Sequence, residues 1–250
     1  MKVSIITVTY NRAHVIERAL QSLRAQSYCD IQSVVIDGAS QDDTVQRVSA
    51  LQSDTDILIS ESDDGIYDAL NKGIRLSDGD IVGVLHSDDI LNDAYVIERI
   101  VKIFRSSNCD LVSGDAVFFT QRGNSKSIRR YKSVSLSKLA LAWGMMPAHT
   151  ATFMRRELFS EVGLYKKDFA ICGDYEWFCR ACAMRDLKHV VINQVVTRME
   201  VGGRSSAGVK NTLLLNREVI RSCRENGIYT NWLMLLSKYP RKLLEYTMHR

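Results

Sequence analysis

Long apolar runs are missing from this sequence of 250 residues. No stretch reaches the roughly 18 consecutive apolar residues that a membrane-spanning helix needs, so no segment is predicted to cross a bilayer. Near the start, the apolar stretch VSIITVTY is too short for a signal peptide with its cleavage site, and Asn11 and Arg12 follow it at once. We therefore interpret it as a first β-strand.

Proline and regularly spaced cysteine are also scarce. The two prolines, Pro147 and Pro240, exclude a proline-rich linker. The six cysteines lack the dense spacing of a secreted disulfide scaffold, so we expect a cytoplasmic protein. Cys179 and Cys182 form a C-x-x-C pair inside an apolar helical pattern, and no second ligand pair follows. We favour core packing over a metal or redox role for this pair.

A strong charge of one sign is absent as well. The chain has 33 basic and 29 acidic residues, a net charge of +4, and nothing in this balance requires nucleic acid as a partner. Hydrophobic residues make up 46% and charged residues 25% of the chain, which is typical of a soluble globular protein. A chain of this length can bury a full core.

Short β-branched runs alternate with segments of helical period in the first half of the chain. Runs such as SVVI and DIVGVL are apolar at consecutive positions, as in strands that helices cover on both faces. The alternation predicts an α/β fold with a mostly parallel sheet and flanking helices. The expected strands are 3–9, 33–36, 57–60, 81–85 and 111–114, and the expected helices are 15–26, 44–51, 66–76 and 94–104.

After residue 115 the alternation becomes irregular, and we expect this part to bind a second substrate. It contains a basic, serine-rich stretch, a strand, two helices and further strands before a helical C-terminal tail. The expected elements are a basic stretch at 121–137, strands at 152–154 and within 190–201, and helices at 157–162, 175–184, 212–225 and 231–250. We divide the chain into 1–115, 116–205 and a helical extension at 206–250.

Two adjacent carboxylates, Asp88 and Asp89, follow the fourth expected strand. Ligands of open parallel sheets bind outside the carboxyl ends of the strands, so this aspartate pair is a candidate site. In a turn, one carboxylate can accept hydrogen bonds from a ligand hydroxyl while the other binds a hard cation. Two oxygen ligands suit Mg²⁺ or Mn²⁺ that is shared with substrate phosphates. The alternative is a solvated turn.

Several motifs in register resemble a known family. VSIITVTYNR, VVIDGASQDDT, DDGIYDALNKGI and GDIVGVLHSDDIL resemble the nucleotide-sugar half of family-2 glycosyltransferases with the GT-A fold. PAHTATFMRRELFSEVGLY and CGDYEWFCRA resemble the acceptor half of the bacterial branch that builds surface polysaccharides. The resemblance covers roughly residues 1–205. It implies a UDP-, GDP- or dTDP-sugar donor, a glycan or polyprenyl-linked acceptor, and Mn²⁺ or Mg²⁺ as the cofactor.

The same resemblance implies a donor site. Tyr10 would pack near the base, Asp37 would approach the base or ribose, and the aspartate pair would occupy the D-x-D-type metal motif with Asp89 as the direct ligand. The alternatives are that Tyr10 is a surface aromatic, that Asp37 is a turn or cap carboxylate, and that Tyr67 belongs to a helix face packed on the sheet. The implied donor residues are Thr9, Tyr10, Asn11, Arg12, Asp37, Asp64, Tyr67, Asn71, Lys72 and Asp88, and the implied metal ligands are Asp88 and Asp89.

Two positions depart from the family pattern. The second strand ends in Asp37-Gly38, where many relatives have two acidic residues, so the identity of the donor stays open. Ser87 fills the first position of D-x-D, which leaves at most two protein carboxylates for the ion. We therefore expect an ion whose binding depends on the substrate.

Glycosyl transfer to a hydroxyl requires a base, and the resemblance implies Asp174 for this role. Asp174 stands in GDYE at the start of an expected helix, where the family has its base, and Glu176 is the second choice. The alternative for Asp174 is a helix N-cap, which is compatible with catalysis. His149 is either a residue of the site or a core histidine. A single displacement by the activated hydroxyl predicts inversion at the anomeric carbon.

Two segments outside this core carry further hypotheses. VGGRSS, at 201–206, resembles a flexible family segment in which Arg204 would meet phosphate, although a surface turn explains its glycines equally well. The tail NWLMLLSKYPRKLLEYTMHR is basic, aromatic and amphipathic. It is suited to peripheral contact with the inner membrane, or to packing on the domain or on a partner chain. The basic stretch with Arg129 and Arg130 would meet the acceptor's pyrophosphate.

Two rival functions remain open at this point. A nucleotidyltransferase on a similar sheet would need a glycine-rich loop after the first strand, and TYNRAH has none. The same absence argues against a dinucleotide site or a P-loop. A non-catalytic protein that binds nucleotide sugars or acts as a scaffold would keep the donor residues, and Asp174 in its GDYE context argues against it.

Overall fold

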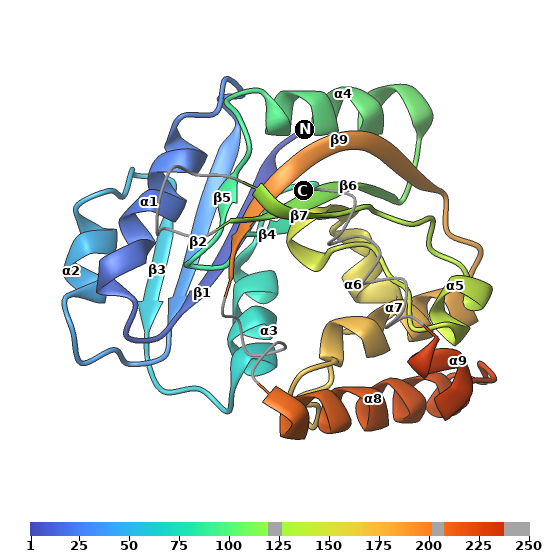
Figure 1. The fold of residues 1–250 in the computed structure, drawn as a ribbon. Helices are drawn as coiled ribbons and strands as arrows, with labels where there is room; N and C mark the ends of the chain where they lie inside the picture. The colour runs from blue at the N-terminus through green and yellow to red at the C-terminus, as the bar shows by residue number, and fades with distance from the viewer. Residues whose placement is uncertain (120–126, 202–207, 238–250) are drawn as a thin grey trace.

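The first half of the chain forms the predicted parallel sheet (Figure 1). The computed structural model describes residues 1–119, 127–201 and 208–237. The central strand β1 pairs in parallel with β2 and β4, and β2 pairs in parallel with β3. The elements of this half are β1 (Val3–Thr9), α1 (Ala13–Arg24), β2 (Ile31–Asp37), α2 (Thr44–Ser49), β3 (Ile57–Ser60), α3 (Ile66–Leu76), β4 (Ile81–Val84), β5 (Ile90–Leu91) and α4 (Val96–Ser107).

The second half continues the same sheet in mixed orientation. The full order is β3-β2-β1-β4-β8-β6-β9-β5, with β7 paired to β6. Strand β8 lies between β4 and β6 and is antiparallel to both, so the parallel order predicted through residue 114 ends at β4. The elements of this half are β6 (Leu111–Phe119), β7 (Ser127–Tyr131), α5 (Lys138–Ala142), a 3₁₀ turn (His149–Ala151), β8 (Thr152–Arg155), α6 (Glu157–Glu161), α7 (Gly173–Met184), β9 (His189–Glu200), α8 (Gly208–Glu225) and α9 (Trp232–Leu236).

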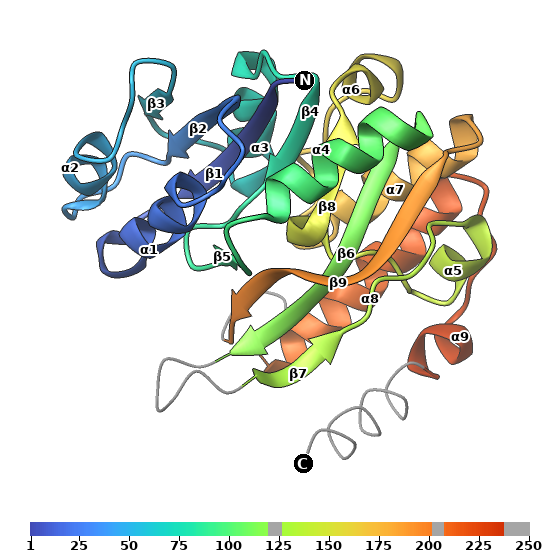
Figure 2. The ribbon, with the colours of Figure 1, turned by 90° about the horizontal axis from the view of Figure 1, so that it is seen from above.

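Strand β9 brings the end of the second half to the aspartate pair. It runs parallel to β6, and its last residues pair with β5, the two-residue strand that directly follows Asp89. Figure 2 shows β6 and β9 running side by side toward the region of β5. The sequence predicted strands within 190–201, but it gave no signal for β5, β7 or α5, since each has only two to five residues.

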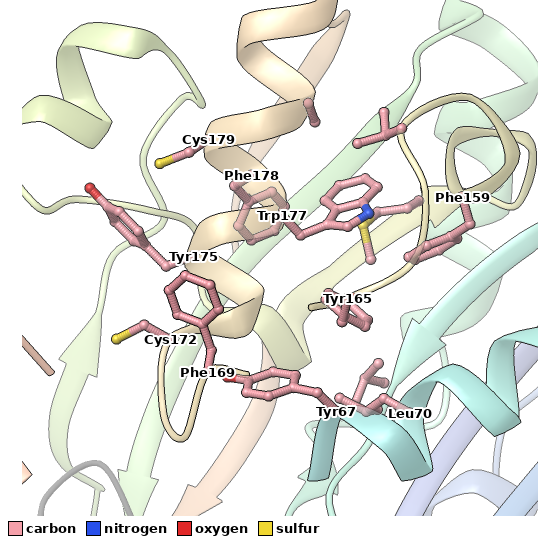
Figure 3. Packing of buried hydrophobic residues seen from close by; sticks show 14 of the residues in the cluster. Tyr67, Leu70, Phe159, Tyr165, Phe169, Cys172, Tyr175, Trp177, Phe178 and Cys179 are labelled. Atoms are coloured by element: carbon pink, nitrogen blue, oxygen red, sulfur yellow. The ribbon is translucent and has the colours of Figure 1, made fainter. Parts of the chain in front are cut away.

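Hydrophobic clusters lie on both faces of the sheet. Adjacent residues of one strand belong to different clusters, as Phe153 and Met154 on β8 do, because side chains alternate along a strand. The larger cluster joins α3, α7 and α8 around Trp177, which is fully buried (Figure 3). Cys179 is buried there without a disulfide, in agreement with core packing.

Among residues 1–119, 127–201 and 208–237, no helix has the length and apolar character needed to cross a membrane. Helix α9 confirms that the predicted helical tail begins near residue 231. The rest of that tail, from residue 238, and the predicted loop with Gly202, Gly203 and Arg204 lie outside the described residues.

Candidate active site

The loops after β1 and β2 are held together by hydrogen bonds at the carboxyl end of the sheet. The N–H of Asn11 donates to Ser40 Oγ at 2.7 Å, and Asn11 Oδ1 accepts from the N–H of Gln41 at 2.8 Å. Asn11 has a φ of 51°, in the left-handed region that asparagine tolerates better than most residues. The side chain of Asn11 therefore organises the loop, and the preceding Tyr10 is left 57% exposed.

Thr9 and Arg12 lie on either side of this turn. Thr9 is buried, and within the described part of the chain its Oγ1 has no hydrogen-bond partner. The backbone N–H of Arg12 donates to Thr44 Oγ1 at 2.8 Å, while its side chain is exposed. Both residues thus lie at the strand end where the sequence predicted a donor pocket, with an unused hydroxyl from Thr9 and an accessible guanidinium from Arg12.

Asp63, which the sequence reasoning missed, converges with Tyr10 on Gly38. A Cβ atom added to Gly38 would lie 2.7 Å from Asp63 Oδ2 and 3.4 Å from Tyr10 Cδ2. The missing side chain at Gly38, noted above as a departure from the family pattern, therefore leaves room for the Asp63 carboxylate. An exposed aromatic ring beside a carboxylate can stack on a base and accept its N–H groups.

The neighbouring Asp64 points elsewhere, although the resemblance implied it as a donor residue. Its side chain is 80% exposed and pairs with Lys167 at 3.1 Å. Lys72, on α3, is bound to the loop before this helix, where Nζ lies 2.8 Å from Glu61 Oε1 and donates to the carbonyl of Ser62 at 2.9 Å. Asp63 is thus better placed than Asp64 to meet a ligand at Tyr10, and Lys72 orders the loop that carries Asp63.

Asp37 lies buried at the end of β2 and is fully hydrogen-bonded. Its Oδ2 accepts from the N–H of Ser40 at 2.8 Å and from the hydroxyl of Ser60 at 2.7 Å, and its Oδ1 accepts from the hydroxyl of Ser40 at 2.5 Å. These bonds join the ends of β2 and β3. Asp37 therefore fixes the strand ends next to Tyr10 and has no hydrogen-bonding capacity turned toward a ligand.

Tyr67 and Asn71, on α3, face the second half of the chain. The hydroxyl of Tyr67 lies 2.6 Å from the carbonyl of Ile171 and 3.2 Å from Asp174 Oδ1. The amide of Asn71 donates to the carbonyl of Tyr165 at 2.8 Å and accepts from its N–H at 2.9 Å. With its amide engaged in this way, Asn71 holds the chain before α7, whereas Tyr67 touches the predicted base.

The two carboxylates of the aspartate pair differ in burial. Asp88 is half-buried, and Asp89 is only 3% exposed. Burial and the nearby charge of Asp88 raise the pKa of Asp89 well above its usual value. The nearby Thr150 hydroxyl lowers the pKa of Asp89 in part. Within the described part of the chain, however, neither Thr150 Oγ1 nor Asp89 Oδ2 has a hydrogen bond of ordinary geometry.

Arg18 ties the aspartate pair to the end of β9. Its Nη2 donates to the backbone carbonyl of Asp88 at 3.0 Å and to Glu200 Oε2 at 2.6 Å. Its guanidinium also lies over the ring of Phe119, 5.1 Å from the ring centre. The arginine therefore positions the backbone of the pair without occupying the Asp88 carboxylate.

His86, which precedes the pair by two residues, links the two halves of the site. Burial, followed by the neighbouring His149, lowers its pKa to about 4, while Asp88 and Asp174 act in the opposite direction. His86 therefore lies near both carboxylates. His149 is 9% exposed, and its Nε2 is 2.8 Å from the hydroxyl of Tyr165, so it is a hydrogen-bonded histidine within the core. The sequence stretch HSDD displayed His86, but no pattern indicated its role.

Asp174 lies in the first turn of α7, as predicted. The N-cap is Cys172, and Asp174 Oδ1 accepts from the N–H of Tyr175 at 2.9 Å. Burial raises the pKa of Asp174, which makes it a stronger base when ionised. Glu176 is fully buried and paired with Arg180 at 3.0 Å and Lys166 at 3.1 Å. Of the two acidic residues, Asp174 is therefore the one available to a substrate.

Glu218, on α8, caps the chain just before Asp174. Its carboxylate accepts from the backbone N–H groups of Ala170, Ile171 and Cys172, at 2.8, 2.9 and 2.8 Å. These groups approach the positive end of α7, where a carboxylate is stabilised. The sequence contained no signal for this cap because Glu218 is 46 residues away from Cys172.

The family model of glycosyl transferase family 2 matches residues 4–163, a segment that ends before Asp174. The uncharacterized glycosyltransferase Rv1514c of Mycobacterium tuberculosis is 32% identical over 220 residues, which are 82% of this chain and 77% of that protein. The PGL/p-HBAD biosynthesis glycosyltransferase of Mycobacterium bovis is 29% identical over 219 residues, which are 84% of this chain and 82% of that protein.

Two solved structures share the fold. S. aureus TarS 1-349 in complex with UDP-GlcNAc has a TM-score of 0.68 at 18% identity, covering 89% of this chain and 66% of that one. The mannosyltransferase PcManGT from Pyrobaculum calidifontis, in complex with GDP-Man and Mn²⁺, has a TM-score of 0.63 at 20% identity, covering 88% and 64%. The chain thus spans about two thirds of each solved chain. With its GT-A fold and its match over most of the sequence, the protein belongs to glycosyl transferase family 2 and is a glycosyltransferase.

Proposed function

We propose that this enzyme transfers a sugar, with inversion, from a nucleotide-sugar donor to a hydroxyl of a glycan or lipid-linked glycan, and that it depends on a divalent metal ion. The observation that carries the proposal is that His86 interacts electrostatically with both Asp88 and Asp174, while its ring centre lies 6.2 Å from that of His149. This supports a single site that contains a candidate metal ligand and a candidate base. Family-2 membership supports glycosyl transfer over nucleotidyl transfer.

We assign the base and ribose end of the donor to the pocket at Tyr10. Tyr10 stacks on the base, and Asp63 accepts its N–H groups, since both side chains converge on Gly38. Thr9 and Arg12 line the same pocket, and Asp37 and Asn11 fix its walls. Structural neighbours bound to UDP-GlcNAc and to GDP-Man support a nucleotide-sugar ligand, but they leave the nucleotide undecided.

The aspartate pair suits a divalent cation. Asp89 Oδ2 has no hydrogen-bond partner among the described residues, and the two carboxylates repel each other. A bound cation would relieve both. No third acidic, histidine or cysteine ligand joins them within residues 1–119, 127–201 and 208–237, so donor phosphates would complete the coordination. Asp88 is the more accessible ligand and Asp89 supports it. When bound, Mn²⁺ or Mg²⁺ supplies charge neutralisation for the leaving diphosphate.

The residues of the chain itself supply the proton transfer. Asp174 accepts the proton of the attacking acceptor hydroxyl, and the hydrogen bond from Tyr67 fixes the orientation of its carboxylate. Tyr67 and Asn71 act as positioning residues for the chain around Asp174, while Lys72 orders the Asp63 loop and Asp64 lies outside the pocket. A single displacement by the deprotonated hydroxyl gives inversion.

We further propose that the acceptor is a glycan or a polyprenyl-linked molecule. We also propose that the enzyme acts in the cytoplasm, in peripheral contact with the inner membrane. Arg130 pairs with Asp115 at 2.6 Å and Arg129 lies over the ring of Phe118, and we assign the contact with an acceptor pyrophosphate to this pair of arginines. The name of the M. bovis relative, a PGL/p-HBAD biosynthesis glycosyltransferase, supports a role in building a glycoconjugate.

Isothermal titration with UDP-, GDP- and dTDP-sugars, with and without Mn²⁺, tests the proposal. We expect one nucleotide class to bind, and to bind more tightly with the ion. Asp174→Asn should retain donor binding and lose transfer by about 10³-fold or more, since it removes the base and keeps the shape. Glu176→Gln is the control for a nearby acidic residue outside the site.

Three results would contradict the proposal: binding of no nucleotide sugar, transfer that chelators leave unchanged, or full turnover by Asp174→Asn. Donor binding by the wild-type protein without transfer to any glycan acceptor would instead favour the non-catalytic alternative.

A further inference from the structure

A row of four aromatic rings links Asp174 to the aspartate pair. The centres of neighbouring rings are 5.6 to 6.2 Å apart, and the row consists of Tyr67, Tyr165, His149 and His86. Figure 3 shows Tyr67 and Tyr165 next to each other. At one end of the row, the hydroxyl of Tyr67 lies 3.2 Å from Asp174 Oδ1. At the other end, a single residue separates His86 from the aspartate pair.

His86 is the accessible member of this row. The other three residues are at most 9% exposed, and their polar atoms are engaged. Tyr67 donates to the carbonyl of Ile171 at 2.6 Å, and His149 Nε2 lies 2.8 Å from the hydroxyl of Tyr165. His86 is half-buried, and within residues 1–119, 127–201 and 208–237 its ring nitrogens have no hydrogen-bond partner. Its ring is therefore available to a ligand.

The reaction geometry indicates which part of a ligand lies there. In an inverting displacement, the leaving group and the attacking hydroxyl lie on opposite faces of the sugar. With the diphosphate at the aspartate pair and the hydroxyl at Asp174, the transferred sugar lies between these two groups. His86 interacts electrostatically with both Asp88 and Asp174, so it lies next to the sugar and not next to the base.

We propose that His86 binds the transferred sugar of the donor through hydrogen bonds to its hydroxyl groups. The imidazole ring offers an N–H donor in either protonation state, and a hydroxyl both accepts and donates. A site that hydrogen-bonds a substrate hydroxyl discriminates against sugars that place this hydroxyl elsewhere. The inference rests on the proposed function and deepens it, because it assigns a residue of this chain to the sugar itself.

Isothermal titration of two ligands, both with Mn²⁺, tests the inference. The ligands are the nucleotide sugar that the wild type binds and the corresponding nucleoside diphosphate alone. His86→Phe keeps a ring beside His149 and removes both nitrogens, so the Kd for the nucleotide sugar should rise about tenfold while the Kd for the diphosphate stays unchanged. His86→Gln keeps an N–H and should recover part of the loss. The preference among sugars on the same nucleotide should shrink in His86→Phe.

His14→Asn is the matched control, because His14 is an exposed histidine on α1, outside the row of rings. Its ratio of the two Kd values should equal that of the wild type. Circular dichroism should show that each variant is folded, and His86→Ala provides the same comparison without a bulky ring.

The inference is overturned if His86→Phe and His86→Ala keep the wild-type ratio. It is also overturned if they weaken diphosphate binding as much as nucleotide-sugar binding, since His86 would then serve the metal or the diphosphate. A wild type that binds nucleotide sugars and transfers the sugar, with an unchanged ratio in the variants, refutes the role of His86 alone. A wild type that binds no nucleotide sugar refutes the proposed function as well.

Discussion

Replacement of Glu218 by glutamine is the sharpest structural test of how the base is positioned. The carboxylate of Glu218 accepts three backbone N–H groups in the segment that leads into α7. The glutamine side chain has a single acceptor oxygen. It can keep the two bonds that Oε2 makes to Ile171 and Cys172, but it turns an N–H₂ group toward the N–H of Ala170.

The expected cost follows from these bonds. Hydrogen bonds to a charged group contribute about 1.5–3 kcal/mol each and neutral ones about 1 kcal/mol. Two bonds are weakened and one is lost, although the exposed Ala170 can bind water instead. We expect about 2–3 kcal/mol of destabilisation, which lowers Tm by about 5–10 °C in a chain of this size.

Catalysis should suffer as well, because the Glu218 cap ends two residues before Asp174. A displacement of the base by about 1 Å can lower a rate by about 100-fold. We expect kcat for Glu218→Gln to fall about tenfold or more, with the KM for the donor little changed, since Tyr10 and Asp63 are far from this contact in sequence and on other loops. Calorimetry and steady-state kinetics measure the two effects.

Glu225→Gln is the matched control on the same helix. Glu225 is exposed and pairs with Lys166 and Arg221 at the surface, where ion pairs contribute about 0–1 kcal/mol. If Glu218→Gln kept the Tm and kcat of Glu225→Gln, the three hydrogen bonds would not hold the base, and the reasoning from Glu218 to Asp174 would fail.

Tyr67→Phe removes a hydrogen bond that lowers the pKa of Asp174, so the pKa of Asp174 should rise. Because the rate falls as the pH drops through that pKa, the acidic limb of the pH profile of kcat should move to higher pH. An unmoved limb would mean that Asp174 is not the titrating base. Asp63→Ala should weaken donor binding in calorimetry about tenfold or more, while Asp64→Ala should leave it unchanged. If Asp64→Ala weakened binding and Asp63→Ala did not, Asp64 would be the donor residue, as the resemblance implied. Asn71→Ala should cost about 2–4 kcal/mol in urea unfolding, because it leaves two buried backbone groups without partners; a cost under about 1 kcal/mol would argue against that role.

Features that depend on local sequence were predictable. The parallel arrangement of β1 to β4 followed from apolar runs that alternate with helical periods, because both patterns arise within a few residues. The same patterns located the polar residues that follow the strands, and these residues include the aspartate pair. Family motifs, which are local as well, indicated Asp174 at the start of α7.

The direction of each side chain could not be predicted in the same way. Asp63 and Asp64 are adjacent, and only the structure shows that Asp63 approaches Gly38 beside Tyr10 while Asp64 pairs with Lys167. The family resemblance implied Asp64, and a loop without a period carries no signal that separates two adjacent residues. Likewise Asp89, implied as the direct metal ligand, is the more buried member of the pair.

The sequence by itself determined the class of the fold, the succession of its first strands and helices along the chain, and the family motifs that contain the candidate site residues. Tertiary structure alone decided that Asn71 holds Tyr165, 94 residues away, that Glu218 caps the turn before Asp174, and that β9 returns to β5 beside Asp89. The physical reason is the range of the interactions. Hydrophobic periods and turn preferences act over a few neighbouring residues, whereas a hydrogen bond between distant segments exists only once the packed core has brought them together.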